Sequence, residues 1–421
     1  MKSRNWVILA ASICLSVLGL AKVLYAKQPL SIVTPNTKLS ASIQASNEVV
    51  NTKLVAANTR LSFKLFSEIL KKQSNQNIFI SPASVAIALD MLYDGSSGQT
   101  QQAIGQTLEL QGMSSQEINQ ANAFLKTILK NADPTVQISI ANSLWVRENE
   151  PFQPKFLQVI QNNYQAEVKN INFGAPTAPS VINAWVKQST NGKIHKIVDQ
   201  IEPNVVFLLL NAIYFKGNWT EPFPKEATEN RPFTLLNGTQ KQHPMMRQKK
   251  LRYFPYYENE MFQAVSLPYG QGRLSMYIFL PNQGVSLKTF YENLNAANWQ
   301  KWLNQFTPYE AGISMSLPRF KCEYSIELKD TLKALGMEMA FAKGADFSAM
   351  SPSSLWIDQV KHKTFVEVNE EGTESAAVTE VGAVRGSPIE MSVDRPFFFA
   401  IRDNQTGTIL FMGSIVEPIN G

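Results

Sequence analysis

EEGTESAAVTEVGAVRGS, residues Glu370–Ser387, is a long run of small side chains in a chain that is otherwise rich in large apolar residues. Successive side chains of a strand point to opposite faces, so the run divides into two sets. Both glutamates between Gly372 and Arg385 fall in one set, and the other set carries no charge before Arg385. This is the pattern of a half-buried strand, yet glycine, acidic and small residues pack poorly in a sheet. The stretch therefore predicts a segment that can become a strand by entering a narrow gap.

The rest of the chain predicts a mixed fold. Apolar residues at helical spacing indicate a helix near residues 49–72, and Ser81 with Pro82 in capping positions indicates a second helix that ends at Gly95. Further helices are predicted within 114–132 and 180–193, and strands within 136–146, 205–217, 263–281, 313–326 and 395–418. Helices gather early and strands later without regular βαβ alternation, which favours an α+β fold in one large domain.

The N-terminal segment has the layout of a secretory signal. Lys2 and Arg4 precede an apolar run over residues 6–20, and cleavage after Ala21 or Ala26 is compatible with the pattern. Removal of this segment would place the protein outside the cell or in a periplasm. The alternative is that the run is retained as an N-terminal membrane anchor, because about 20 apolar residues span a bilayer.

The expected organisation has three parts. Residues 1–26 are the signal or anchor, residues 27–48 are polar and lack periodicity and so predict a flexible linker, and residues 49–421 form a single domain. Only Cys14 and Cys322 are present, so removal of the signal leaves one thiol and no internal disulfide. The domain must then hold by core packing, which its 44% of hydrophobic residues permits.

Motifs for common chemistries are missing from the sequence. The three histidines, His195, His243 and His362, show no metal-ligand spacing, and neither phosphate-binding glycine loops nor a G-x-S-x-G elbow occurs. No metal or other cofactor is expected, and each histidine is interpreted as a hydrogen-bonded structural residue. The basic run 241–253 lacks the aromatic interleaving and the extended basic face of a nucleic-acid site. A hydrolase that assembles its triad in space stays a minor alternative.

Four long motifs resemble signatures of the serpin family, in the same order. These motifs are NIFISPASVAIALDMLYDGSSGQT (77–100), FLLLNAIYFKGNWTEPF (207–223), VEVNEEGTESAA (366–377) and DRPFFFAI (394–401). The resemblance covers about residues 50–421. It implies a fold of three β-sheets and eight or nine helices, with the stretch after Glu370 as an exposed reactive-centre loop.

The family resemblance also assigns residues to three regions. A hinge that would enter the central sheet matches Gly372, Thr373, Glu374, Ser375, Ala376 and Ala377. A polar cluster beneath that sheet, the shutter, matches Ser81, Ser84, Asn211 and His362. The region where insertion begins, the breach, matches Trp219, Arg319 and Glu370. Taken without the resemblance, Ser81 could be only a helix cap and Trp219 only a core residue.

The reactive bond has two candidate positions. Counting from Glu370 with the commonest loop length of inhibitory serpins puts the cut between Gly386 and Ser387, and a loop one residue shorter puts it between Arg385 and Gly386. Arg385 is favoured because a guanidinium can bind an acidic specificity pocket through two hydrogen bonds, whereas glycine offers no side chain.

The leading hypothesis is a monomeric, secreted suicide inhibitor of a trypsin-like serine protease, which is its covalent partner. Nucleic acid is not an expected partner, nor is a membrane unless the N-terminal segment is retained. The runner-up is a non-inhibitory serpin that acts as a binding or transport module. The small, uncharged hinge favours inhibition, because an ion on the inward face would be buried without a partner.

Overall fold

A computed structural model describes residues 50–202, 204–371 and 387–420 of the 421-residue chain. The described residues all belong to one compact unit, Val50–Gly421. The predicted signal or anchor and the linker lie outside the described residues. Within the described part, no helix is long and apolar enough to cross a membrane.

Nine α-helices occur in the described part of the chain. They are α2 (Thr52–Gln73), α3 (Pro82–Gly95), α4 (Gly98–Thr107), α5 (Ser115–Lys130), α6 (Pro154–Val159), α7 (Ala178–Ser189), α8 (Leu287–Asn293), α9 (Ala296–Leu303) and α10 (Lys329–Leu332). Side-chain caps fix several starts: Asn51 accepts from the Lys53 and Leu54 amides at 3.1 Å, and Ser114 and Glu117 form a capping box. The prediction for α3 is confirmed, with Ser81 as N-cap and Pro82 in the first turn.

In the residues that the structure describes, sixteen strands form three sheets. Their bounds are β1 (Ile78–Ile80), β2 (Val136–Arg147), β3 (Glu167–Ile171), β4 (Phe207–Gly217), β5 (Glu229–Thr234), β6 (Gln240–Arg247), β7 (Pro255–Glu258), β8 (Phe262–Tyr269), β9 (Leu274–Pro281), β10 (Thr307–Pro308), β11 (Ile313–Pro318), β12 (Phe320–Glu327), β13 (Gln359–Val368), β14 (Ile389–Ser392), β15 (Phe397–Asp403) and β16 (Ile409–Ile415). The sheet orders are β1-β16-β15-β9-β8-β7-β10, β14-β11-β6-β5 and β12-β13-β4-β2-β3. The expected α+β fold with three sheets is confirmed.

One predicted strand is two strands. The apolar run 313–326 predicts a strand, but β11 ends at Pro318 in the four-stranded sheet and β12 begins at Phe320 in the five-stranded sheet. Arg319 is the joint between them. Proline cannot donate to a ladder, so a strand that reaches Pro318 readily ends there. The change of sheet places the Arg319 side chain where the two sheets meet.

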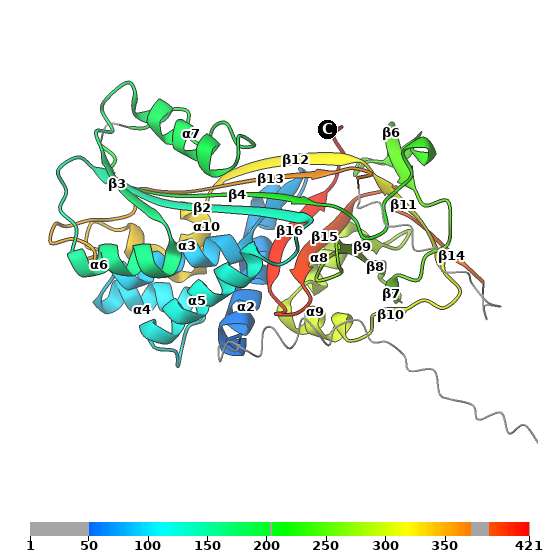
Figure 1. Cartoon of the computed structure of the whole chain (residues 1–421), viewed down its shortest axis with the longest axis horizontal. Coiled ribbons are helices and arrows are strands. Elements are labelled where there is room, and N and C mark those ends of the chain that lie inside the picture. Colours follow the sequence, from blue (N-terminus) through cyan, green and yellow to red (C-terminus); the bar gives the residue numbers. More distant parts are fainter. Residues whose placement is uncertain (1–49, 203, 372–386, 421) are drawn as a thin grey trace, which may run out of the picture. The chain divides into compact units, whose positions relative to one another are not determined.

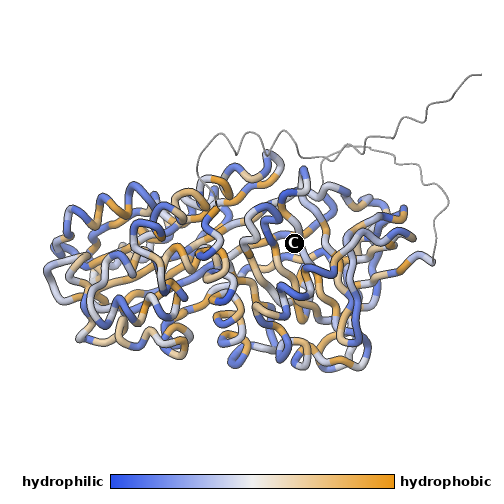
Figure 2. Tube along the Cα trace, turned by 90° about the horizontal axis from the view of Figure 1, so that it is seen from below, coloured by the Kyte–Doolittle hydropathy of each residue, from blue (hydrophilic) through white to orange (hydrophobic). Residues whose placement is uncertain are grey.

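Two apolar clusters hold the five-stranded sheet from opposite sides. The larger cluster contains α2, α3 and the inner faces of the sheets, and the smaller one joins Trp145 and Leu210 of the sheet to Ile182 and Trp185 of α7. In Figure 1, α7 lies over one face of this sheet and α3 to α6 lie on the other. Figure 2 shows hydrophilic and hydrophobic residues alternating along the helices, as expected for helices with one buried face.

The basic run 241–253 lies on β6 and the loop after it, and acidic residues neutralise part of its charge. Lys241 pairs with Glu417 at 2.8 Å, Lys249 with Glu226 at 2.9 Å and Arg252 with Glu221 at 3.2 Å. This charge pattern is that of a partly exposed strand and a solvated loop, because β6 itself lies between β11 and β5 in its sheet.

Candidate functional site

The candidate site is the seam between β13 and β4 in the middle of the five-stranded sheet. The two strands pair in parallel over eight residue pairs, from Gln359 opposite Leu208 to Val366 opposite Phe215. On either side of this seam the neighbouring pairs, β12 with β13 and β4 with β2, are antiparallel. A strand that ran back from Glu371 between β13 and β4 would be antiparallel to both, the arrangement with the better hydrogen-bond geometry.

The segment between β13 and β14 joins two different sheets. β13 belongs to the five-stranded sheet, whereas β14 pairs in parallel with β11 at the edge of the four-stranded sheet. The predicted hinge residues and both Arg385 and Gly386 lie outside the described residues. Ser387 is the first described residue after them, and its carbonyl accepts a hydrogen bond from the Tyr309 hydroxyl at 3.3 Å.

The predicted shutter residues meet at the middle of the seam. His362 of β13 and Asn211 of β4 are cross-strand partners, and His362 Nδ1 lies 2.5 Å from Asn211 Oδ1. The Ser81 amide donates to His362 Nε2 at 3.0 Å, and Asn211 Nδ2 donates to Ser84 Oγ at 2.5 Å. Because Nε2 accepts from an amide, Nδ1 must carry the proton that His362 donates to Asn211. All four side chains are at most 1% exposed.

Burial sets the charge state of this cluster. It lowers the pKa of His362 to about 3, so the imidazole is neutral at physiological pH, as its accepting Nε2 requires. Asn142 of β2 extends the cluster, because its side-chain oxygen accepts from Asn211 Nδ2. No local sequence pattern singles out Asn142. Its opposition to Asn211 in the β2–β4 ladder depends on strand register, which local periodicity does not encode.

The predicted breach residues meet where β13 ends. Trp219 Nε1 donates to the Asn369 carbonyl at 2.8 Å, and the Trp219 amide donates to the Glu371 carbonyl at 3.3 Å. The Trp219 ring stacks on Tyr269 with centroids 4.3 Å apart and an interplanar angle of 12°. Trp219 follows β4 by two residues, so these hydrogen bonds tie the β4 side of the seam to the chain just before the hinge.

Glu370 and Arg319 form the second half of the breach. The Glu370 side chain is only 3% exposed, and its Oε1 accepts from Arg319 Nη2 and, at 2.5 Å, from Thr228 Oγ1. Burial alone would raise the pKa of Glu370, but the hydrogen bonds from Arg319 and Thr228 outweigh it and hold the pKa below its usual range. The carboxylate at the base of the hinge is therefore ionised and paired.

Two further residues of the breach were not identified from the sequence. Thr228 precedes β5, and His243 is a fully buried residue of β6 whose Nε2 lies 2.5 Å from the Arg319 carbonyl. His243 and Thr228 are far from Glu370 in sequence, and only the junction of two sheets brings them together. His243 and His362 form the hydrogen bonds expected of structural residues, whereas His195 is exposed.

The described residues contain no cluster typical of a metal site or a hydrolytic triad. They hold no group of three or more His, Cys, Asp or Glu side chains arranged to bind a metal. Within them, the hydrogen bonds of His243 and His362 run to backbone groups and to Asn211 rather than to a carboxylate or a nucleophilic hydroxyl.

Comparison with known proteins places these features in one family. The family model described as Serpin (serine protease inhibitor) matches residues 56–418. The bovine leukocyte elastase inhibitor is 36% identical over 380 residues, which are 87% of this chain and all of that protein. The native-state structure of tengpin, a thermophilic serpin, is 30% identical with a TM-score of 0.78, and the match covers 88% of this chain and 96% of that one.

A ligand-binding protein shares the same fold. Human thyroxine-binding globulin in complex with thyroxine is 27% identical with a TM-score of 0.79, and the match covers 87% of this chain and 99% of that chain. The length of the family match, the identity to curated relatives and the three-sheet architecture agree, and this chain belongs to the serpin family of protease inhibitors and related proteins.

Proposed function

We propose that this serpin is a single-use inhibitor of a trypsin-like serine protease. The observation that carries the proposal is the seam between β13 and β4: a parallel pair in the middle of an otherwise largely antiparallel sheet, adjoining a hinge of small residues. Strand addition to a sheet is a known mode of recognition, and serpin loop insertion is itself an instance of it. Insertion of the loop replaces one parallel seam by two antiparallel seams, and each added backbone hydrogen bond contributes about 0.5–1.5 kcal/mol.

The chemical step belongs to the protease. Its serine oxygen attacks the Arg385 carbonyl carbon, the bond to the Gly386 nitrogen breaks, and that nitrogen leaves as an amine with a proton delivered by the protease's own base. An ester now joins the two proteins. Insertion of the freed segment into the seam would carry the protease away and distort it before water cleaves the ester. The native state is then protected by a barrier rather than by being the lowest state.

The hinge composition supports insertion. Thr373, Ser375 and Ala377 form the set that would face the core, and none of them is charged. A charged side chain there would be buried without a partner, at a cost of several kcal/mol. Signal-directed export and a monomeric state complete the proposal, with the secreted protein meeting its target outside the cell or in a periplasm.

The second candidate function is a non-inhibitory binding or transport module, favoured by the shared fold with thyroxine-binding globulin. Mixing residues 49–421 with trypsin and with an elastase tests both functions on a denaturing gel. A band at the summed mass, with a released C-terminal fragment that begins at Gly386, is the expected result for trypsin. Cleavage of the loop without any loss of protease activity would contradict the proposed inhibition. The binding or transport module would then be the favoured function. A fragment that begins at Ser387 would move the reactive bond to Gly386.

A further inference from the structure

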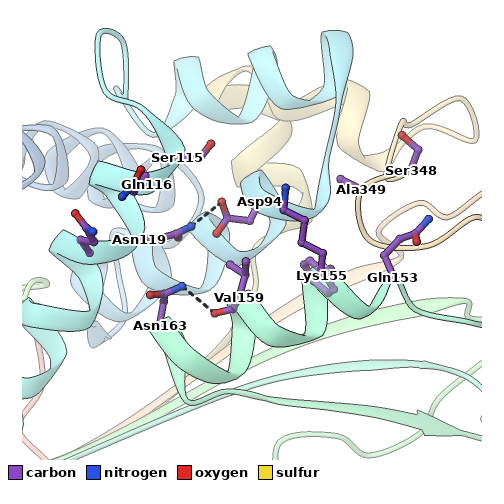
Figure 3. Close-up of a pocket in the computed structure, with 12 residues that line it drawn as sticks. Asp94, Ser115, Gln116, Asn119, Gln153, Lys155, Val159, Asn163, Ser348 and Ala349 are labelled. Carbon is purple, nitrogen blue, oxygen red and sulfur yellow. Dashed lines mark hydrogen bonds between the residues drawn. The ribbon is translucent and has the colours of Figure 1, made fainter.

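A pocket lies on the helical side of the domain, away from the seam. The pocket has a volume of about 740 Å³, within the size range of small-molecule sites. It lies between the end of α3, the start of α5, α6 and residues 348–349, and none of the seam, shutter or breach residues lines it. Figure 3 shows Asp94 and Lys155 reaching this pocket from α3 and α6.

Asp94 brings a negative charge to the pocket wall. Asn119 Nδ2 donates to Asp94 Oδ1 at 3.2 Å, and the Tyr164 hydroxyl lies 3.0 Å from Asp94 Oδ2, so both neighbours are neutral. Among the described residues no cation pairs with Asp94. Burial raises the pKa of Asp94 to about 6, against the lowering effect of its hydrogen bonds to Tyr164 and Asn119, so the carboxyl is mostly ionised at pH 7.5.

The neighbouring carboxyl group does not add a second charge. Asp90 lies one turn earlier on α3, is 1% exposed, and accepts from Asn122 Nδ2 at 2.7 Å. Burial, with the charge of Asp94 as a further cause, raises the pKa of Asp90 to about 8. Asp90 is therefore mostly neutral when Asp94 is ionised, and the α3 side of the pocket has a single negative charge.

Lys155 brings a positive charge to the pocket from α6. It is an exposed residue in the first turn of α6, and in the described part of the chain it forms no ion pair with Asp94 or any other carboxylate. The side chains of Phe156, Val159 and Ala349 give the pocket an apolar part, and Gln116 and Gln153 line it with amides that can donate and accept. The pocket thus offers one anionic and one cationic group, neither neutralised by the protein.

We propose that this pocket binds a small zwitterion, a free amino acid or short peptide, with the ligand ammonium on Asp94 and the ligand carboxylate on Lys155. A purely cationic ligand would meet Lys155 without a compensating charge, and a purely anionic one would meet Asp94 in the same way. An uncharged ligand would leave both protein charges unpaired. Charge complementarity of both signs therefore selects the zwitterion.

Isothermal titration calorimetry of the 49–421 domain at pH 7.5 tests the proposal with ω-amino acids from glycine to 6-aminohexanoate, a series that varies the spacing between the charges. We expect at least one member to bind with a Kd of about 1–10 mM, the affinity of a weak small-ligand contact. Hexylamine and hexanoate, each with one of the two charges, should bind at least about fivefold more weakly. Absence of binding by the whole series, or equal binding of hexylamine, would overturn the zwitterion site.

Single substitutions test the contributions of Lys155 and Asp94 to binding separately. Lys155→Met removes the cation from an exposed position and should weaken binding at least about fivefold, whereas Lys155→Arg should retain it. Asp94→Asn should weaken binding similarly, and circular dichroism would show whether the loss of its hydrogen bonds has altered the fold. Lys187→Met on the exposed side of α7 is the matched control. Unchanged affinity in Lys155→Met would contradict the proposal even if Asp94→Asn failed to fold.

Discussion

His362 and Asn211 are hydrogen-bonded across the seam that a reactive loop would have to enter. The bond joins His362 Nδ1 on β13 to Asn211 Oδ1 on β4 at 2.5 Å, and the two residues are register partners in the parallel ladder. At the end of the seam, Trp219 Nε1 donates a second hydrogen bond across it, to the Asn369 carbonyl. The strands cannot part without breaking both contacts, so we expect these residues to contribute to the barrier to insertion.

Replacement of His362 should weaken the closed seam. His362→Ala leaves the Ser81 amide and Asn211 Oδ1 buried without these partners, at a cost of about 1–3 kcal/mol for each group. We expect a lower midpoint in urea for the first unfolding transition and faster spontaneous polymerisation on native gels. The exposed His195→Ala is the control and should match the unmodified protein. Equal urea midpoints for His362→Ala and His195→Ala would show that His362 does not stabilise the closed seam.

Loss of the charge on Glu370 should loosen the breach. Glu370→Gln keeps the shape but removes the charge-assisted bond from Arg319, which we expect to destabilise the native state by about 2 kcal/mol. The measurement is the urea midpoint and the rate of polymerisation at mildly raised temperature. Glu367→Gln, an exposed change three residues earlier on β13, should have little effect. A double-mutant cycle with Arg319→Met that gave no coupling energy would refute the pairing as a source of stability.

The free energy of unfolding should fall as the pH is lowered, and His362 should cause part of this fall. The pKa of His362 is about 3 in the folded protein, below the ordinary value near 6.5, so the unfolded chain binds the proton more readily. The stabilisation is fully present above pH 6.5 and is lost as the pH falls toward 3.

Between pH 6.5 and 5 this linkage predicts a loss of about 2 kcal/mol. Urea unfolding at pH 7.5 and 5 should show this loss in the unmodified protein and a smaller loss in His362→Gln. Asp90 and Asp94 have raised pKa values, so their titration stabilises the folded protein as the pH falls, opposite to the effect of His362. Both proteins contain these two residues, so their effect cancels when the two losses of unfolding free energy are compared. The stabilisation from Glu370, whose pKa is lowered, is lost only at pH values below this interval. The same loss in both proteins would show that His362 does not titrate as proposed.

A charge on the inward face of the hinge should turn the inhibitor into a substrate. Thr373→Arg would bury an unpaired guanidinium on insertion, at a cost of several kcal/mol, so insertion should become slower than hydrolysis of the acyl-enzyme. Denaturing gels should show clipped protein in place of the covalent complex. Glu374→Arg changes the adjacent residue, which belongs to the set expected to face outward after insertion, and should remain an inhibitor. A covalent complex in the Thr373→Arg variant would disprove insertion of this face.

Arg385 should determine the target. Arg385→Ala removes the two hydrogen bonds to an acidic specificity pocket, and we expect the rate of trypsin inhibition to fall by about 10²-fold or more. Arg385→Lys keeps the charge and should retain most of the rate. If Arg385→Ala inhibited trypsin at the original rate, or if the original protein inhibited only an elastase, the reactive bond would lie elsewhere.

Local sequence signals were sufficient for several parts of the molecule. Ser81 and Pro82 predicted the start of α3, the apolar residues within 395–418 predicted the strands found there as β15 and β16, and four long motifs identified the family. The shutter and breach residues other than Arg319 could be named because they lie within or beside those motifs. These features depend on capping, periodicity and turn chemistry over a few neighbouring residues, which the sequence carries directly.

Only the tertiary structure decided which distant residues meet. The parallel register of β13 with β4, the division of residues 313–326 between two sheets, and the approach of Thr228 and His243 to the breach all join segments far apart in the chain. Asp94 and Lys155 likewise come to one pocket from separate helices. Such contacts arise when whole elements pack to bury their apolar faces, and a side chain's partners then follow from the register and angle of that packing rather than from its neighbours in sequence.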